Sequence, residues 1–307
     1  GHYTLSDNIR IMEHLMKRIV VLALCAVFLI AVHAQTRRAL VIGLGKQEDP
    51  AWQKINGDKD VPLVTEMLGR AGFNKRHIRT LVNEQATKAA IVHAFLMMAE
   101  TAEKGDIVYI HFSGHGQQMR DRNGDEADGL DESWIPYDAY RQPCNKDRGE
   151  KHLVDDEVNI CLSAIRDKIG SSGKLLVAID ACHSGDATRD IDDGEEVARG
   201  VGDVFEATYK MLLKIVESVK KAPAGTERWI TLSACESNQV NYEMRQPQVG
   251  KLTYALYTQI EKAATLDNDA FMRLIRKFVN SNTLSQPQRP VLSGTDRDKY
   301  SITDILR

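Results

Sequence analysis

Short, almost wholly apolar runs alternate along this chain with longer segments of helical periodicity. The apolar runs are expected strands, and they cover residues 37–44, 77–82, 106–112, 173–180, 228–234 and 289–293. The expected helices between them cover residues 61–68, 87–103, 155–169, 251–264 and 269–280. Strands without polar alternation are typical of a sheet that is buried on both faces. This order therefore predicts an α/β fold whose mostly parallel sheet lies between two layers of helices.

The composition is that of an ordinary globular chain with one domain. Of 307 residues, 43% are hydrophobic, 27% are charged and only 8 are proline, and no internal repeat is present. We expect a single domain over residues 35–307, with an insertion at about 186–226 that is helical over 204–221. The net charge of -3 argues against a nucleic-acid partner, because such proteins carry a concentrated surplus of Lys and Arg.

The first 34 residues have the layout of an export signal. Residues 1–15 precede Met16 and form an upstream extension that we leave out of the fold. A basic start at residues 16–18, an uncharged apolar run over 19–32 and a small residue at Ala34 predict a signal peptide over 16–34. A membrane anchor or a buried helix is the alternative, but the run is shorter than the roughly 20 residues of a bilayer span. We expect an exported protein, periplasmic or secreted, without a membrane anchor after cleavage.

Four cysteines remain after the predicted signal: Cys144, Cys161, Cys182 and Cys235. They are too few and too scattered for a disulfide scaffold. No CxxC pair suggests a zinc site. A disulfide between Cys144 and Cys161 stays open.

Two of the expected strands lead into segments that carry a histidine and a cysteine among small residues. His115 follows the strand at 106–112, and Cys182 follows the strand at 173–180. Functional groups of open α/β sheets gather at the carboxyl ends of the strands. A Cys182 thiolate would attack a carbonyl carbon, with His115 as general base and then general acid. The backbone N–H groups of Gly116 and Cys182 would stabilise the oxyanion.

The motifs Ser113-Gly114-His115-Gly116 and Asp180-Ala181-Cys182-His183-Ser184-Gly185 resemble those of the metacaspase branch of the caspase-like cysteine peptidases (peptidase C14 type), in a bacterial form. The likeness covers residues 38–293, with further matches at 124–132, 136–138, 154–158 and 232–235. It implies a caspase-like three-layer sandwich, in which helices cover both faces of a six-stranded, mostly parallel sheet. It also implies a catalytic dyad of His115 and Cys182 and a monomeric chain.

Carboxylates near the expected nucleophile indicate the substrate. Asp180 lies two residues before the cysteine, and Ser113 two residues before the histidine, so each shares its neighbour's side of the strand. Asp60 matches an acidic pocket position of metacaspases, but the stretch 57–60 is one residue shorter than their pattern, so Asp58 is an alternative. Buried paired carboxylates are costly unless a cation joins them. We therefore predict cleavage after Arg or Lys and not after Asp, unless Asp180 only binds backbone amides.

The segment over 121–132 is rich in acidic residues and is a candidate for calcium binding. It partly matches an EF-hand loop, but Glu126 replaces the required glycine and flanking helices are absent, which excludes that motif. The family resemblance instead implies a calcium site formed by Asp131, Asp155, Asp156 and an acid after the nucleophile, Asp190 or Asp186. A solvated acidic loop is the alternative. The peptidase chemistry itself requires no cofactor.

Basic residues in and beside the insertion are candidate sites of self-cleavage: Arg189, Arg199, Lys220, Lys221 and Arg228. Ordinary surface charge is the alternative explanation for them. Two other functions stay open, a catalytically restrained caspase-like domain that binds or scaffolds, and a peptidase of the clostripain or gingipain kind.

Overall fold

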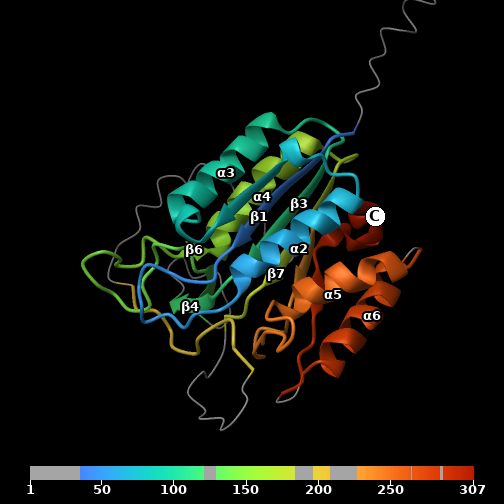
Figure 1. Cartoon of the computed structure of the whole chain (residues 1–307). Helices are drawn as coiled ribbons and strands as arrows, with labels where there is room; N and C mark the ends of the chain where they lie inside the picture. The colour runs from blue at the N-terminus through green and yellow to red at the C-terminus, as the bar shows by residue number, and fades with distance from the viewer. Residues whose placement is uncertain (1–34, 121–128, 184–195, 208–226, 264, 284–285) are drawn as a thin grey trace, which may run out of the picture. The chain divides into compact units, whose positions relative to one another are not determined.

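The fold is built on a six-stranded sheet with the strand order β2-β1-β3-β7-β8-β9 (Figure 1). The strands are β1 (Arg37–Gly43), β2 (Ile78–Val82), β3 (Ile107–Ser113), β7 (Lys174–Asp180), β8 (Ile230–Ser233) and β9 (Val291–Ser293). The first five are parallel, and β9 is antiparallel to β8. The predicted six-stranded, mostly parallel sheet is confirmed.

This computed structural model describes residues 35–120, 129–183, 196–207, 227–263, 265–283 and 286–307. Residues 36–307 form one compact unit. The predicted signal peptide and upstream extension lie outside the described residues, as do Asp186, Arg189, Asp190, Lys220 and Lys221. No helix within the described ranges is long and apolar enough to span a bilayer.

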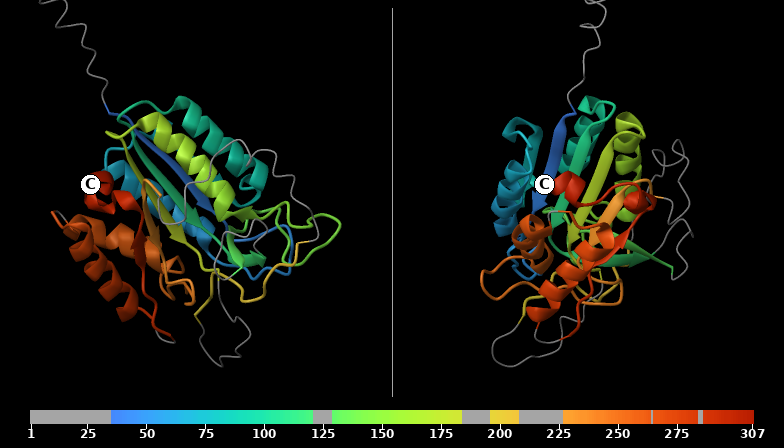
Figure 2. Two further views of the ribbon diagram at one scale, coloured as in Figure 1. Left: turned by 180° about the vertical axis from the view of Figure 1, so that it is seen from behind. Right: turned by 90° about the vertical axis from the view of Figure 1, so that its right-hand side faces the viewer.

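Helices cover both faces of the sheet (Figures 1 and 2). One face is packed against α2 (Gly57–Arg70), α5 (Lys251–Gln259), α6 (Asn268–Ser281) and α7 (Thr303–Leu306), and the other against α3 (Lys88–Thr101) and α4 (Asp155–Ile169). Successive side chains of a strand point to opposite faces, so Val41 belongs to the first core and its neighbour Leu40 to the second. Burial of apolar surface, at about 25 cal/mol per Å², holds the three layers together.

The first turn of α2 carries Asp60 and lies at the carboxyl ends of the strands. We predicted a helix from residue 61, but it begins at Gly57. A side chain at Gly57 would lie 2.5 Å from the Leu44 carbonyl oxygen and 2.6 Å from that of Ser113. Only glycine allows this approach. The approach holds the first turn of α2, which carries Asp60, against the carboxyl ends of β1 and β3.

A second, three-stranded antiparallel sheet follows β3, and the sequence pattern did not indicate it. It consists of β4 (Gly116–Arg120), β5 (Leu130–Trp134) and β6 (Leu153–Val154). These strands are short and carry polar residues beside an acidic stretch, so the segment resembled a loop. Pairing between strands, rather than local propensity, determines this small sheet.

One expectation about a connecting segment needs correction, and one open question is answered. The helix predicted over 204–221 does not begin there: residues 204–207 are not helical, and Phe205 forms an isolated parallel bridge with Met119. The rest of that helix lies outside the described residues. Cys144 and Cys161 are both free thiols, so the disulfide left open above is not formed.

The register of the parallel strands brings their carboxyl ends to one edge. Gly43 pairs with Ser113, and Ser113 pairs with Asp180. Ile179 in turn pairs with Ser233 near the end of β8. Chain segments that leave β1, β3, β7 and β8 therefore start side by side.

Candidate active site

Cys182 and His115 lie at this edge, just beyond two neighbouring strands. The N–H of Gly114 donates to the carbonyl oxygen of Asp180 at 3.4 Å, so the two exits run next to each other. Both side chains are buried, with exposed fractions of 2% for Cys182 and 1% for His115. The topology thus brings together the two groups that the sequence separates by more than sixty positions.

His115 is held in one defined orientation. Its Nε2 donates to the backbone carbonyl oxygen of Gln53 at 2.7 Å, and its ring stacks on Trp52 with 5.1 Å between centroids. Nδ1 is therefore the nitrogen with the lone pair, and it has no hydrogen-bond partner in the described part of the chain. Burial lowers the pKa of His115 to about 4, so the ring is neutral near pH 7. A neutral imidazole with an uncommitted lone pair is a competent proton acceptor.

The Cys182 thiol lies next to a second cysteine. The neighbouring Cys235 thiol lowers the pKa of Cys182 and outweighs the opposing effect of burial. Both cysteines line a pocket of about 190 Å³ together with His183 and Glu132. His183 Nδ1 lies 3.1 Å from a Glu132 carboxylate oxygen. These surroundings favour the thiolate form, which is the nucleophile.

Three buried carboxylates surround a single guanidinium, that of Arg199. Its Nη1 lies 2.6 Å from Asp60 Oδ2 and 3.6 Å from Asp180 Oδ1. Glu243 Oε1 accepts from Nε at 3.0 Å and lies 2.9 Å from Nη2. All four side chains are almost fully buried. We call Asp60, Asp180 and Glu243 the acid cage.

The acid cage has more negative than positive charge. Burial raises the pKa of Asp60 to about 6, although Arg199 opposes this shift. Burial also disfavours ionised Asp180, but Arg199 and hydrogen bonds from Asn241 and Thr253 outweigh it and keep the Asp180 pKa below its ordinary value. The carboxylates in turn raise the pKa of Arg199. Without a guanidinium or ammonium, the cage would be an uncompensated buried charge, which is strongly unfavourable.

The backbone of Arg199 lies over the predicted catalytic groups. Its carbonyl oxygen accepts from the N–H of Cys182 at 3.0 Å and from the N–H of Gly116 at 3.3 Å. At the next residue, Gly200, a side chain would come 2.6 Å from Cys182 Sγ and would also overlap the Cys182 carbonyl oxygen. The Arg199–Gly200 peptide therefore lies directly against the thiol, with its carbonyl oxygen on the donor pair.

Residues 196–201, which we call the strap, cross the site with a bend at Arg199, between isolated bridges at Ala198 and Gly200. On one side of the Arg199–Gly200 bond, the Arg199 N–H donates to the Asn241 carbonyl at 2.9 Å, and the Glu243 N–H donates to the Val197 carbonyl at 2.8 Å. On the other side, the N–H of Val201 donates to the Gly116 carbonyl at 3.3 Å. Strand-like pairing on both sides is how an extended peptide docks on a sheet edge.

Ser113 lies behind the acid cage and not in contact with Arg199. Its hydroxyl is 3.0 Å from His111 Nε2 and 3.4 Å from Thr253 Oγ1. The Thr253 hydroxyl donates to Asp180 Oδ2 at 2.7 Å. Ser113 thus belongs to the hydrogen-bonded support of Asp180, rather than to the surface that meets the guanidinium.

Of the two aspartates proposed for the first helix, Asp60 meets the guanidinium. Asp58 Oδ2 instead accepts from Asn83 Nδ2 at 3.2 Å. Asp60 Oδ1 also accepts from the Gly250 N–H at 2.8 Å. The helix turn between them separates the two carboxylates, although they are two residues apart in sequence.

The proposed calcium ligands come from β5 and the first turn of α4. Ser133 pairs with Val154, and this register leads Asp131 toward Asp155 and Asp156. Carboxylate oxygens are the donor type that calcium prefers. Among the described residues, no group of three or more acidic, histidine or cysteine side chains is arranged to hold a metal ion.

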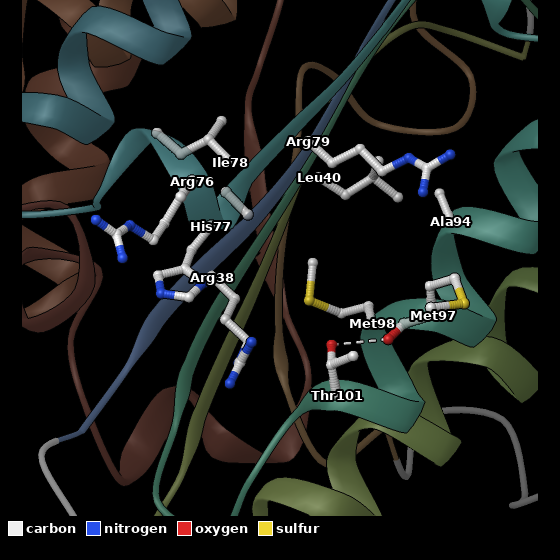
Figure 3. Close-up of a pocket in the computed structure, with 11 residues that line it drawn as sticks. Arg38, Leu40, Arg76, His77, Ile78, Arg79, Ala94, Met97, Met98 and Thr101 are labelled. Carbon is white, nitrogen blue, oxygen red and sulfur yellow. Dashed lines mark hydrogen bonds between the residues drawn. The ribbon is translucent and has the colours of Figure 1, made fainter.

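Another pocket lies at the opposite end of the sheet (Figure 3). It has a volume of about 160 Å³ and lies where β1 and β2 begin, between Arg38, Arg76 and Met98. Arg38 is already paired with Asp106 at 2.6 Å. Its lining includes no cysteine, and the Thr101 hydroxyl donates to the Met97 carbonyl oxygen at 2.8 Å, so the candidate for thiol chemistry is the edge that carries Cys182.

Glu243 and Gln53 are functional candidates that sequence reasoning missed. Glu243 lies in a non-periodic stretch after β8, and Gln53 acts through a backbone carbonyl, which any residue type can supply. Neither carries a local signal. Cys235 falls in a segment that matched the family pattern, but its contact with Cys182 follows only from the pairing of β7 with β8.

Comparison with known families agrees with this architecture. A family model described as the caspase domain of peptidase C14 matches residues 36–301. Two solved structures are similar. A protein of Geobacter sulfurreducens has a TM-score of 0.60 and 25% identity, covering 85% of this chain and 94% of that one. Caspase-1 of Spodoptera frugiperda has a TM-score of 0.57 and 11% identity, and the match covers 85% of this chain and 87% of that one. At this identity the likeness is evidence for the fold alone.

Curated relatives are metacaspases. Metacaspase-1B of Aspergillus fumigatus is 32% identical over 158 residues, which are 49% of this chain and 36% of the relative. Metacaspase-2 of Arabidopsis thaliana is 33% identical over 162 residues, 50% of this chain and 35% of the relative. Metacaspase-1 of Ajellomyces capsulatus is 27% identical over 298 residues, in an alignment that covers 84% of this chain and 79% of the relative. The matched region is thus about a third of the length of several relatives.

Proposed function

Because the chain belongs to the caspase-domain family of peptidases, we propose that it is a cysteine endopeptidase that cleaves peptide bonds after arginine or lysine. One observation carries the proposal. The guanidinium of Arg199 lies among three buried carboxylates, while its carbonyl oxygen accepts two N–H bonds beside the Cys182 thiol. This is the arrangement that a bound basic residue needs at the bond to be cut.

The chemistry proceeds through an acyl-enzyme. Cys182 Sγ attacks the carbonyl carbon after the basic residue, and His115 Nδ1 takes the thiol proton. The N–H groups of Gly116 and Cys182 stabilise the oxyanion. His115 then gives its proton to the leaving amine, the C–N bond breaks, and a thioester remains. Water, deprotonated by His115, hydrolyses the thioester and regenerates the thiol. Gln53 is a positioning residue, because its carbonyl fixes the histidine tautomer.

A comparison of short fluorogenic peptides tests this proposal. Peptides that differ only in Arg, Lys or Asp before the fluorophore are offered to the wild-type protein and to a Cys182→Ala variant. We expect release after Arg and Lys, none after Asp, and none by the variant. Preference for Asp, or release that persists without the Cys182 thiol, would contradict the proposal.

Self-processing is part of the proposal, and Arg199 is the favoured position. The other described basic candidate, Arg228, pairs with Asp167 at 2.5 Å on the surface, away from the thiol. Arg199 is fully buried, and its own peptide bond to Gly200 lies against Cys182. These contacts support Arg199–Gly200 as the bond that the site would cut in its own chain.

The same observation favours a second candidate, a catalytically restrained domain that binds other proteins. A strap that fills the site and is never cut would block substrates. An arginyl chloromethylketone distinguishes the two, because it alkylates only a reactive thiol next to an accessible basic-residue pocket. Labelling that requires Cys182 supports the peptidase, whereas unlabelled, folded protein supports the restrained domain.

Calcium stimulation is a further part of the proposal. Asp131, Asp155 and Asp156 offer hard oxygen donors from β5 and α4, and a residue after the nucleophile would complete the set. A bound cation would order the loops beside the active site. Isothermal titration of a Cys182→Ala protein tests this: binding heat supports the site, and no heat at millimolar calcium removes it. Export and a monomeric state are proposed as well, to be tested by the N-terminus of the secreted protein and by its mass in solution.

A further inference from the structure

A second charged contact, between Lys251 and Glu196, holds the strap. Lys251 is the first residue of α5 and is completely buried. Its ammonium group binds the carboxylate of Glu196. It also donates to Thr283 Oγ1 at 3.1 Å and lies 5.5 Å from the centre of the Tyr242 ring. A fully buried lysine is rare and is stable only when a partner compensates its charge.

Glu196 has a fixed position relative to the bond at the thiol. Counting back from Arg199 as the first residue, Glu196 is the fourth. The Glu243 N–H bond to the Val197 carbonyl and the antiparallel bridge between Ala198 and Tyr242 set this register. An extended peptide that pairs with Asn241 and Glu243 in the same way would bring its own fourth residue to Lys251.

We propose that Lys251 forms a subsite for a carboxylate, so that preferred substrates carry Glu or Asp three residues before the arginine at which they are cut. The inference rests on the proposed function and adds a second determinant to it. When the strap leaves, Lys251 loses Glu196, its ion-pair partner. Its contacts Tyr242 and Thr283 are neutral, Asp180 attracts the ammonium group only from beyond ion-pair distance, and Arg245 repels it. An incoming carboxylate restores the pair, whereas a neutral or basic side chain leaves a desolvated ammonium group without a carboxylate in contact.

The two subsites also determine the direction of binding. The acid cage is negative and Lys251 is positive, and the strap spans them with Arg199 at one end and Glu196 at the other. A peptide bound in the reverse direction would bring like charges together at both ends. Repulsion of this kind excludes wrong partners at least as effectively as attraction selects the right ones.

Three peptides test the subsite in the wild-type protein without any substitution. They are Glu-Val-Ala-Arg, Gln-Val-Ala-Arg and Lys-Val-Ala-Arg, each with the same fluorophore after Arg. We expect kcat/KM for the Glu peptide to exceed that for the Gln peptide by roughly tenfold, with the Lys peptide slower still. Competition from the strap affects all three equally, so it cancels in the ratios.

Variants of Lys251 then assign the preference to this side chain. Lys251→Met should bring the Glu and Gln peptides to within about twofold of each other, and Lys251→Arg should keep the preference for Glu. Lys277→Met, on an exposed position of α6, is the matched control and should keep the wild-type ratios. The Lys251→Arg variant and the peptide series remain informative if Lys251→Met does not fold.

The outcomes separate this inference from the proposed function. Cleavage after Arg at equal rates for Glu and Gln peptides would overturn the subsite and leave the peptidase proposal intact. A Glu preference that survives in folded Lys251→Met would also overturn it. If no peptide with Arg is cleaved and no thiol is labelled by the chloromethylketone, the proposed function fails, and the subsite fails with it.

Discussion

The carbonyl oxygen of Arg199 lies 3.0 Å from the backbone nitrogen of Cys182. The guanidinium group of Arg199 lies in the acid cage. One residue of the chain therefore contacts both the N–H donors of Gly116 and Cys182 and the acid cage. The two sites are correctly spaced for a single bound arginine.

Removal of either member of the dyad should abolish peptide hydrolysis. Cys182→Ala removes the nucleophile and His115→Ala its base, and we expect each to lower kcat/KM for an Arg peptide by roughly 10³-fold or more. Cys144→Ala is the matched control, because Cys144 is a free thiol that does not line the Cys182 pocket. Activity that depends on Cys144 or survives in Cys182→Ala would show that another thiol does the chemistry.

Asp60 should make substrate binding depend on pH. Burial raises its pKa to about 6, so Asp60 takes up a proton as the pH falls through 6 and no longer attracts a cation. KM for an Arg peptide should therefore rise between pH 7 and pH 5, whereas His115, with a pKa of about 4, stays neutral there. Asp60→Asn should lower kcat/KM at pH 7 by roughly 30-fold or more and flatten this pH dependence.

The control for that experiment is Asp58→Asn. Asp58 lies two residues away on the same helix but binds Asn83 instead of the guanidinium. Its kcat/KM for the Arg peptide should stay within about twofold of wild type. A large loss in Asp58→Asn with little effect of Asp60→Asn would reverse the assignment of the pocket.

Glu243 should make arginine a better substrate residue than lysine. It contacts Nε and Nη2 of Arg199, and lysine has no group at these two positions. Glu243→Gln should reduce kcat/KM for Arg peptides by roughly tenfold or more and for Lys peptides much less, so the Arg/Lys ratio falls. Glu261→Gln, which removes only an exposed ion pair with Arg70, is the control. An unchanged ratio in Glu243→Gln would exclude this role.

Gly200 should be required for docking of the strap. In Gly200→Ala the new methyl group would overlap the Cys182 carbonyl oxygen and approach its Sγ, so we expect loss of self-cleavage and faster initial hydrolysis of added peptides. Gly69→Ala is the control, since nothing lies within 4 Å of a side chain there. Peptide hydrolysis is measured in the first minutes after purification, before self-cleavage of the wild-type protein can release its strap. Slower hydrolysis in Gly200→Ala would mean that the strap does not block the site.

Much of the fold was predictable because strands buried on both faces have an unmistakable apolar pattern. The strands that lead to His115 and Cys182 follow from this pattern, and the helix over 155–169 follows from its helical periodicity. The small β4-β5-β6 sheet was missed because its strands are short and partly polar. These strands are held by pairing with one another, and no local sequence pattern encodes that pairing.

The acid cage was predictable in part. Asp60 and Asp180 stand near recognisable motifs, and a shared cation follows from the cost of burying two carboxylates. Glu243 and Lys251 come from loop and helix ends after β8 that only the tertiary structure brings to the strap. The strap itself has no recognisable pattern in the sequence. The residues that follow it, 204–207, were expected to begin a helix and do not.

The most direct test of the central claim is the intact mass of the purified full chain, followed over time. If the Arg199–Gly200 bond is held as a substrate, the wild-type protein yields a fragment whose N-terminus is Gly200, and Cys182→Ala stays whole under the same conditions. The same stability of both proteins, or a cut at any other bond with Arg199–Gly200 intact, would contradict the account.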